Sequence, residues 1–150
     1  MRAALAMHPD ADAVFFLGDG LSDIDDVRLD FPSVAFFAVK GNCDFRSYAL
    51  DSWVEKTEEI VLLGKKIVYT HGDLFDAKYG TRELETLAEK RNADIILFGH
   101  THTPFCSYYS KDSGGYYLFN PGSASAGGAS FGLITIEMDK EPLFSHGSIK

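Results

Sequence analysis

Five side chains with the chemistry of metal ligands follow short apolar runs of the sequence, in segments that contain glycine. They are Asp19, Asn42, His71, His100 and His102. All five are oxygen or nitrogen donors, and no thiolate is among them. This donor set is typical of Mn²⁺, Fe, Zn²⁺ or Ni²⁺ bound for hydrolysis, rather than of a structural zinc site built from cysteines.

Each of these residues also has an ordinary interpretation. Asp19 lies between two glycines, and aspartate and glycine are common in plain turns. His71 alone is more often a hydrogen-bonded loop histidine than a ligand, and a pair such as His100 and His102 occurs in several unrelated hydrolase folds. The joint pattern is more specific than any single member, because the side chains recur in order behind four strand-like runs. We therefore expect one shared site.

The elements that must position these side chains follow a recurring design. The four apolar runs are strand-length and rich in β-branched or aromatic residues, and they cover residues 13–17, 34–39, 66–70 and 94–98. Functional residues of open α/β sheets gather at the carboxyl ends of the strands, which is where the candidate ligands follow. Glycine at these points lets the backbone turn sharply and lets a ligand approach closely.

The remaining sequence predicts further elements. Residues 80–94 carry apolar side chains at helical spacing, with acidic residues early and basic residues late. Residues 58–70 indicate a hairpin that turns at Gly64 and Lys65, and three more strand-like runs follow residue 104. Early helices and late antiparallel strands together indicate an α/β fold with layers around two sheets.

The composition limits the class of protein. The length of 150 residues suits one globular domain that spans residues 1–150. A net charge of −8 argues against binding of polymeric nucleic acid, and no apolar run is long enough for a membrane span. Cys43 and Cys106 do not make a disulfide framework, so we expect a reducing cytoplasm. His8 and His146 lie in polar, terminal surroundings and are expected at the surface.

The motifs GDG, GNCD, THGD and GHTH, followed by NPGSAS, resemble in this order the calcineurin-like metallophosphoesterase superfamily. The chain is most similar to its small bacterial and archaeal phosphodiesterases, over nearly its whole length. The resemblance implies a four-layer αββα fold, in which two mixed β-sheets pack together and are flanked by helices. It also implies that Asp19 bridges two metal ions. Asn42, His71 and His100 would complete the shell of one ion, whereas His102 would belong to the other.

This resemblance implies that the protein hydrolyses a small phosphoester by means of a hydroxide that bridges the two ions. Mn²⁺ is the favoured metal, with Zn²⁺, Fe or Ni²⁺ as alternatives. Asp19, Asn42 and His71 would serve catalysis, and Asn42 and His71 would also lie beside the bound phosphoryl group. The turn at Asn120 offers backbone N–H groups to an anion, although it could equally be a structural turn.

The sequence departs from the family pattern at its start, because the first motif, Asp-x-His, does not occur before Asp19. Only residues 1–12 precede the first apolar run, and a parallel strand needs about a dozen residues for its crossover connection alone. We therefore expect that the first strand is missing and that the chain holds one metal ion well and a second poorly. Apolar residues near Phe15 and Phe36 would then be open to solvent and would favour a homo-oligomer.

Cys43 stands where many family members have a histidine, which acts with the next aspartate, here Asp44, to protonate the leaving group. A thiol with a pKa of about 8.5 is a weaker general acid near neutral pH. Cys43 is therefore either part of a weak acid pair with Asp44, which would favour good leaving groups, or a small buried residue without a catalytic role.

A second interpretation is a non-catalytic protein-interaction scaffold of the same fold. The retromer subunit with this fold also keeps a GHTH-like and an NPGSA-like stretch. The complete set of later motifs in this chain favours an enzyme, whereas the missing first motif favours impaired activity.

Overall fold

The computed structural model describes residues 1–44, 54–112, 114–125 and 129–149. The elements within these residues are α1 (Arg2–Met7), β1 (Ala13–Phe16), α2 (Ser22–Asp30), β2 (Ala35–Ala38), β3 (Thr57–Leu62), β4 (Lys65–Thr70), the 3₁₀ turn η1 (Asp73–Phe75), α3 (Arg82–Arg91), β5 (Ile95–Leu97), β6 (Pro104–Lys111), β7 (Gly114–Pro121), β8 (Ser130–Thr135) and β9 (Leu143–Ser148). No helix in the described ranges is long and apolar enough to cross a membrane.

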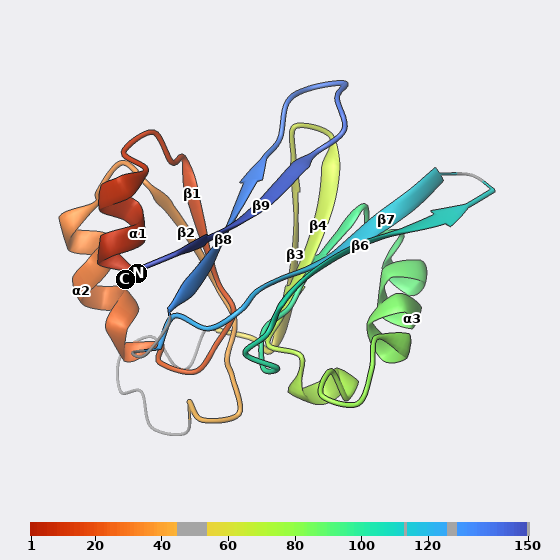
Figure 1. Ribbon diagram of the computed structural model, residues 1–150, viewed down its shortest axis with the longest axis horizontal. Coiled ribbons are helices and arrows are strands. Elements are labelled where there is room, and N and C mark those ends of the chain that lie inside the picture. Colours follow the sequence, from red (N-terminus) through yellow and green to blue (C-terminus); the bar gives the residue numbers. More distant parts are fainter. Residues whose placement is uncertain (45–53, 113, 126–128, 150) are drawn as a thin grey trace.

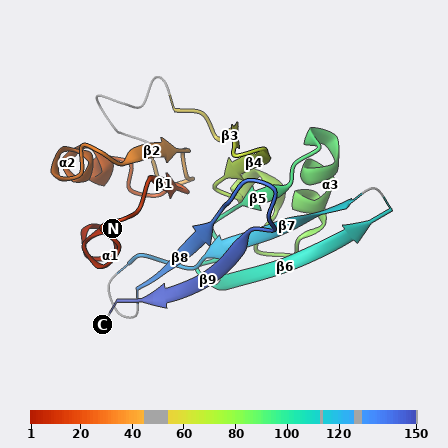
Figure 2. The ribbon, with the colours of Figure 1, turned by 90° about the horizontal axis from the view of Figure 1, so that it is seen from above.

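The described strands form three sheets (Figures 1 and 2). The largest is a mixed five-stranded sheet in the order β3-β4-β5-β7-β6, with β4, β5 and β7 parallel to one another. Strands β3 and β6 run antiparallel at its two edges. A parallel pair, β1 and β2, and an antiparallel pair, β8 and β9, complete the described strands.

The central strands β4 and β5 of the five-stranded sheet are largely buried, because both faces of the sheet are covered there. One face packs against α3 through a cluster that includes Leu84, Ile96 and Leu118. The opposite face packs against the two smaller sheets, where Tyr69 lies among side chains such as Phe37 and Phe144. Helices α1 and α2 lie at the opposite end of the molecule from α3 (Figures 1 and 2). The order of layers is therefore helix, sheet, smaller sheets and helices, which confirms the predicted αββα architecture.

The central strands are continuous apolar runs in the sequence, because alternate residues pack into the hydrophobic clusters on the two faces of the sheet. In β4, Ile67 and Tyr69 enter one cluster, while Val68 enters the other. A strand covered on both faces has no solvent side to carry polar residues. In contrast, all four residues of β1 are half-buried, and Phe15 stacks on Phe37 with ring centroids 5.0 Å apart. The predicted exposure near Phe15 and Phe36 is therefore only partial.

Most of the predicted elements are present. The helix predicted in residues 80–94 is α3, and it ends at Asn92 in the left-handed conformation typical of a helix C-terminus. The predicted hairpin joins β3 to β4, but its turn is at Leu63 and Gly64, one residue earlier than predicted. Both residues have positive φ, as a two-residue hairpin turn requires. Neither α2 nor β9 was predicted, because each has few buried residues and hence a weak apolar pattern.

Candidate metal centre

Loops from two different sheets meet at the carboxyl ends of β1, β2, β4 and β5. The β1 loop carries Asp19, and glycine is required beside it. Gly18 has a φ of 93°, and a Cβ on this residue would lie 2.5 Å from the backbone nitrogen of Gly41 and 2.8 Å from Nδ1 of His71. A side chain at Gly41 would similarly collide with the carboxylate of Asp19. The glycines of the GDG and GNCD motifs therefore allow the loops to come this close.

His71 is at the centre of the site, with only 2% of its surface exposed. Its Nδ1 lies 2.6 Å from the carbonyl oxygen of Leu17. Because a carbonyl oxygen only accepts hydrogen bonds, Nδ1 must carry the proton. In the neutral ring, Nε2 then carries a free lone pair, which is the form in which histidine binds metals.

Three other predicted ligands point toward this nitrogen. Nε2 of His71 lies 3.1 Å from Oδ1 of Asn42 and 3.1 Å from Nδ1 of His100. It also lies 3.4 Å from Oδ2 of Asp19. The amide of Asn42 is oriented by its Nδ2, which donates to Sγ of Cys43 over 3.3 Å and so turns Oδ1 toward His71. The structure thus brings together four of the five predicted ligands.

The four side chains fit a divalent cation in their donor types and in their spacing. Around an ion with ligand bonds near 2.1 Å, neighbouring donor atoms lie about 2.9–3.4 Å apart, close to the three distances at His71. Among the described residues, no three or more His, Cys, Asp and Glu side chains are by themselves arranged so that they could hold a metal ion. The proposed site therefore includes the amide oxygen of Asn42 beside Asp19, His71 and His100.

His100 and His102 lie on a loop with an unusual backbone. Their φ angles are 65° and 59°, and Asp19 has a φ of 64°. Left-handed backbone is uncommon for residues other than glycine and is found preferentially at functional sites. Burial, together with the positive charge of Lys78 and a smaller electrostatic effect of the nearby His71 ring, lowers the pKa of His100. The imidazole of His100 is therefore neutral at pH 7, as a metal ligand must be.

His102 is placed differently from the other predicted ligands. Its side chain is exposed, and within the described part of the chain no hydrogen bond joins it to the cluster at His71. Its assignment to a second ion therefore stays a prediction.

Asp44, predicted to help protonate a leaving group, is engaged with the backbone. Its Oδ2 accepts hydrogen bonds from the N–H groups of Asp19 and Gly41, both over 2.8 Å. Its Oδ1 accepts from Gly20 over 2.7 Å and from Leu21 over 3.0 Å. Burial raises the pKa of Asp44, but these four bonds outweigh it and lower the pKa below its usual value. Asp44 joins the two loops that carry Asp19 and Asn42, and a carboxylate held in this way is a poor proton donor.

Cys43 is exposed, which excludes the alternative of a buried packing residue. Its backbone N–H donates to Oδ1 of Asp19 over 2.8 Å. The negative charge of Asp19, with smaller effects from burial, its hydrogen bond to Asp19 and the charge of Asp44, raises the pKa of the Cys43 thiol. The thiol is therefore protonated at neutral pH and a weak acid.

Two further observations concern residues outside the predicted ligand set. Asn120 is fully buried, and its side chain bonds to the loop of His100 rather than facing solvent. These contacts fit the alternative of a structural turn, and the contact of the turn with substrate stays a prediction. Lys78 was not predicted, although its positive charge acts on both His100 and Cys43. One feature of the sequence could have indicated Lys78: it is a positively charged residue that closely follows the THGD motif, in a chain whose net charge is negative.

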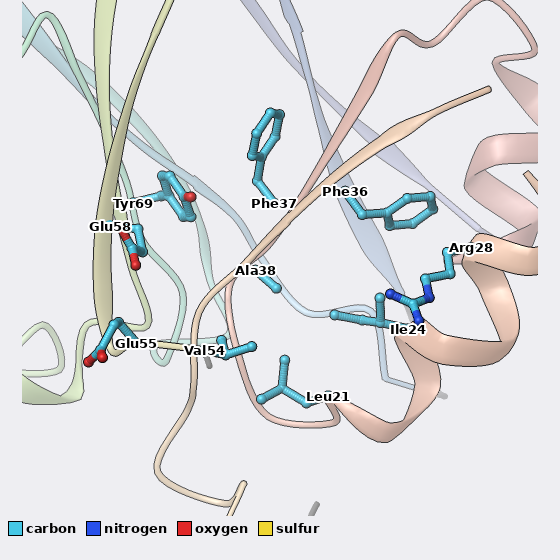
Figure 3. Close-up of a pocket in the computed structure, with 10 residues that line it drawn as sticks. All are labelled: Leu21, Ile24, Arg28, Phe36, Phe37, Ala38, Val54, Glu55, Glu58 and Tyr69. Atoms are coloured by element: carbon cyan, nitrogen blue, oxygen red, sulfur yellow. The ribbon is translucent and has the colours of Figure 1, made fainter. Parts of the chain in front are cut away.

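A cavity of about 230 Å³ lies beside this centre, between α2, β2 and the β3–β4 hairpin (Figure 3). Aromatic and aliphatic side chains such as Phe36, Phe37 and Tyr69 line it, together with the charged residues Arg28 and Glu58. None of its lining residues belongs to the cluster at His71. The cavity is thus separate from the candidate metal centre.

An αββα fold with aspartate, asparagine and histidine donors at its strand ends defines a domain of the metallophosphoesterase type. A family model described as the calcineurin-like phosphoesterase superfamily domain matches residues 1–141, and the chain belongs to this family. The probable metallophosphoesterase YsnB of Bacillus subtilis is 32% identical over 110 residues, which are 69% of this chain and 59% of YsnB. The chain spans less than two thirds of the length of the curated relatives that it matches.

Solved structures show the same fold. A structure described as a novel archaeal phosphodiesterase has a TM-score of 0.71 and 22% identity, and the match covers 99% of this chain and 90% of that one. Vacuolar protein sorting 29 from Cryptosporidium parvum has a TM-score of 0.69 and 18% identity, with 92% of this chain and 81% of that one covered. At these identities the likeness concerns the fold alone.

Proposed function

We propose that this chain is a metal-dependent phosphodiesterase that hydrolyses a small phosphoester in the cytoplasm. The observation that carries the proposal is the convergence of Asp19, Asn42 and His100 on Nε2 of His71. The family assignment supports phosphoester hydrolysis at a general level. The net charge of −8 favours a small substrate over polymeric nucleic acid.

A divalent cation held by these side chains would supply Lewis-acid activation of water and would neutralise the charge of a phosphoryl group. We propose Mn²⁺ for this role, with Zn²⁺, Fe or Ni²⁺ as alternatives, because the donors are oxygen and nitrogen. The chain itself holds the donors in place. The carbonyl of Leu17 fixes the tautomer of His71, and Asp44 fixes the loops of Asp19 and Asn42. His102 is the proposed ligand of a second, more weakly held cation.

The residues around the centre favour substrates with good leaving groups. Cys43 is a weak acid, and Asp44 is committed to backbone N–H groups, so neither protonates a leaving alkoxide efficiently. An aryl leaving group needs no such help. Lys78 would attract the anionic substrate, because its positive charge acts at His100 on the edge of the centre.

The test is hydrolysis of bis(p-nitrophenyl) phosphate by the purified chain, stripped of metal with a chelator and then supplied with Mn²⁺, Zn²⁺ or Ni²⁺. We expect turnover that depends on the added metal, and we expect His71→Asn to abolish it. The matched control is His8→Asn, because His8 packs against Phe131, away from the centre, and should keep full activity. A folded chain with no turnover under any metal would refute the proposal.

A second candidate function is a non-catalytic scaffold for protein interactions. It is favoured by the likeness to the fold of vacuolar protein sorting 29 and by the exposed position of His102, apart from the cluster at His71. A scaffold would bind Mn²⁺ in a calorimeter but turn over neither an aryl phosphodiester nor an aryl phosphomonoester. The same preparations therefore separate the two functions.

A further inference from the structure

The amide of Asn120, near the end of β7, is fully buried and fully engaged. Its Nδ2 donates one hydrogen bond to the carbonyl oxygen of Gly99 over 2.9 Å and another to Oγ1 of Thr101 over 3.1 Å. Its Oδ1 accepts from the N–H of Gly122 over 2.9 Å. Both amide protons are thus used on the residues immediately before and after His100.

The loop that receives these bonds needs an external support. His100 and His102 both have positive φ, a conformation that costs about 1–2 kcal/mol for a residue with a side chain. Such a backbone persists only where the surroundings hold it. Asn120 provides a rigid support, because a buried amide with satisfied hydrogen bonds has one favoured orientation.

A second contact holds Asn120 itself. The ring of His146, on β9, stacks on Phe119 with centroids 4.7 Å apart and an angle of 18° between the planes. Its Nε2 lies 2.8 Å from the backbone oxygen of Asn120 and donates to it, since the carbonyl can only accept. The predicted surface position of His146 is correct, but this residue also connects β9 to the support of the His100 loop.

We propose that Asn120 is a positioning residue of the metal centre, which holds the loop so that Nδ1 of His100 faces Nε2 of His71. This inference rests on the proposed function, because it assumes that His100 is a ligand. Asn120 touches neither metal nor substrate and acts through His100. The role explains why a polar side chain lies fully buried at the end of β7.

The test compares Asn120→Ala with Leu118→Val. Leu118 is fully buried on the same strand and packs in the cluster that faces α3, so its truncation lowers stability without touching the loop. Mn²⁺ affinity is measured by calorimetry on each folded protein. We expect Asn120→Ala to weaken Mn²⁺ binding at least about ten-fold, as is usual for the loss of a residue that orients a ligand. We expect Leu118→Val to bind Mn²⁺ within about two-fold of the parent protein.

A second measurement does not depend on metal. Long-range ¹H–¹⁵N correlation spectra of the histidine rings, recorded in the presence of chelator, report the surroundings of His100. We expect Asn120→Ala to shift the His100 ring signals and Leu118→Val to leave them unchanged. If Asn120→Ala does not fold, Thr101→Val takes its place, because it removes one of the two acceptors of Asn120 on the loop.

The outcomes separate the two proposals. Unchanged Mn²⁺ affinity in the Asn120 or Thr101 variant, or equal loss of affinity in Leu118→Val, would overturn the positioning role. If the parent protein binds no Mn²⁺, the proposed function fails, and the metal-free spectra decide the positioning role alone. Unshifted His100 signals in the variant would then overturn it.

Discussion

Replacement of Asp44 by asparagine should destabilise the fold near the metal centre by about 3 kcal/mol. Each carboxylate oxygen accepts two backbone hydrogen bonds, Oδ2 from Asp19 and Gly41 and Oδ1 from Gly20 and Leu21. Asn has a single acceptor oxygen, so whichever way the amide turns, two N–H groups face a donor. Hydrogen bonds to a charged group contribute about 1.5–3 kcal/mol each, and the partial exposure of Asp44 lowers the total for two to about 3 kcal/mol.

The assay is urea unfolding of Asp44→Asn and of the parent protein with chelator present. Asp10→Asn is the control, because Asp10 is exposed and its substitution removes the same single negative charge. We expect the control to stay within about 0.5 kcal/mol of the parent. A similarly small effect of Asp44→Asn would refute the reasoning, since it would mean that water replaces Asp44 at the four N–H groups.

The same variant has a defined dependence on pH. Because the pKa of Asp44 is lowered in the folded protein, its charge contributes stability above the pKa of the unfolded chain, about 4. This contribution is lost as the pH falls toward the folded pKa. The difference in stability between the parent protein and Asp44→Asn should therefore be constant from about pH 5 to about pH 7, because this range lies roughly one unit or more above the pKa of the unfolded chain. The difference should narrow below about pH 4.

Three further predictions concern single side chains. His100→Ala should lose more bound Mn²⁺ than Cys43→Ser, measured by mass spectrometry of the metal content, because only the first removes a proposed ligand; equal losses would mean that Cys43 has been misassigned. Cys43→Ser should change the rate of hydrolysis of aryl substrates by less than about two-fold, and so should the control Cys106→Ser, since both cysteines are free and exposed. A loss of rate of about ten-fold in Cys43→Ser alone would assign the thiol a direct role in proton transfer. Gly18→Ala should lower stability by more than about 2 kcal/mol, because the added Cβ would lie 2.5 Å and 2.7 Å from backbone atoms of Gly41. In the control Gly64→Ala the added Cβ has no neighbour within 4 Å, so the substitution should cost about 1 kcal/mol from its backbone conformation alone. Thermal unfolding of both variants is the measurement, and equal midpoints would show that the two loops can separate at no cost.

The grouping of four candidate ligands could be predicted from the sequence because each one follows the carboxyl end of a strand. Asp19, Asn42, His71 and His100 were identified in this way, and the structure brings their donor atoms together. The supporting contacts could not be predicted, because they join side chains to backbone groups of distant loops. Asp44, for example, bonds to N–H groups that lie up to 25 residues away in the sequence, and no residue type marks such a partner.

The same limit applies to the fold. The helix α3 was predictable because its buried residues recur at helical spacing. The turn between β3 and β4 was misplaced by one residue because Leu63 adopts positive φ, which a leucine rarely does. The tautomer of His71 likewise depends on the backbone oxygen of Leu17, whose position follows from the packing of two sheets and from no local pattern.

The four proposed ligands come from two different layers of the molecule. Asp19 and Asn42 follow the small parallel sheet β1–β2, whereas His71 and His100 follow the five-stranded sheet. An ion bound by all four would cross-link the two layers, and its binding energy would add to their association. Removal of the ion should then reduce amide hydrogen-exchange protection in β1 and β2 while β4 and β5 keep theirs. The hydrogen-exchange protection of the small sheet would thus depend on the concentration of metal in the surrounding solution.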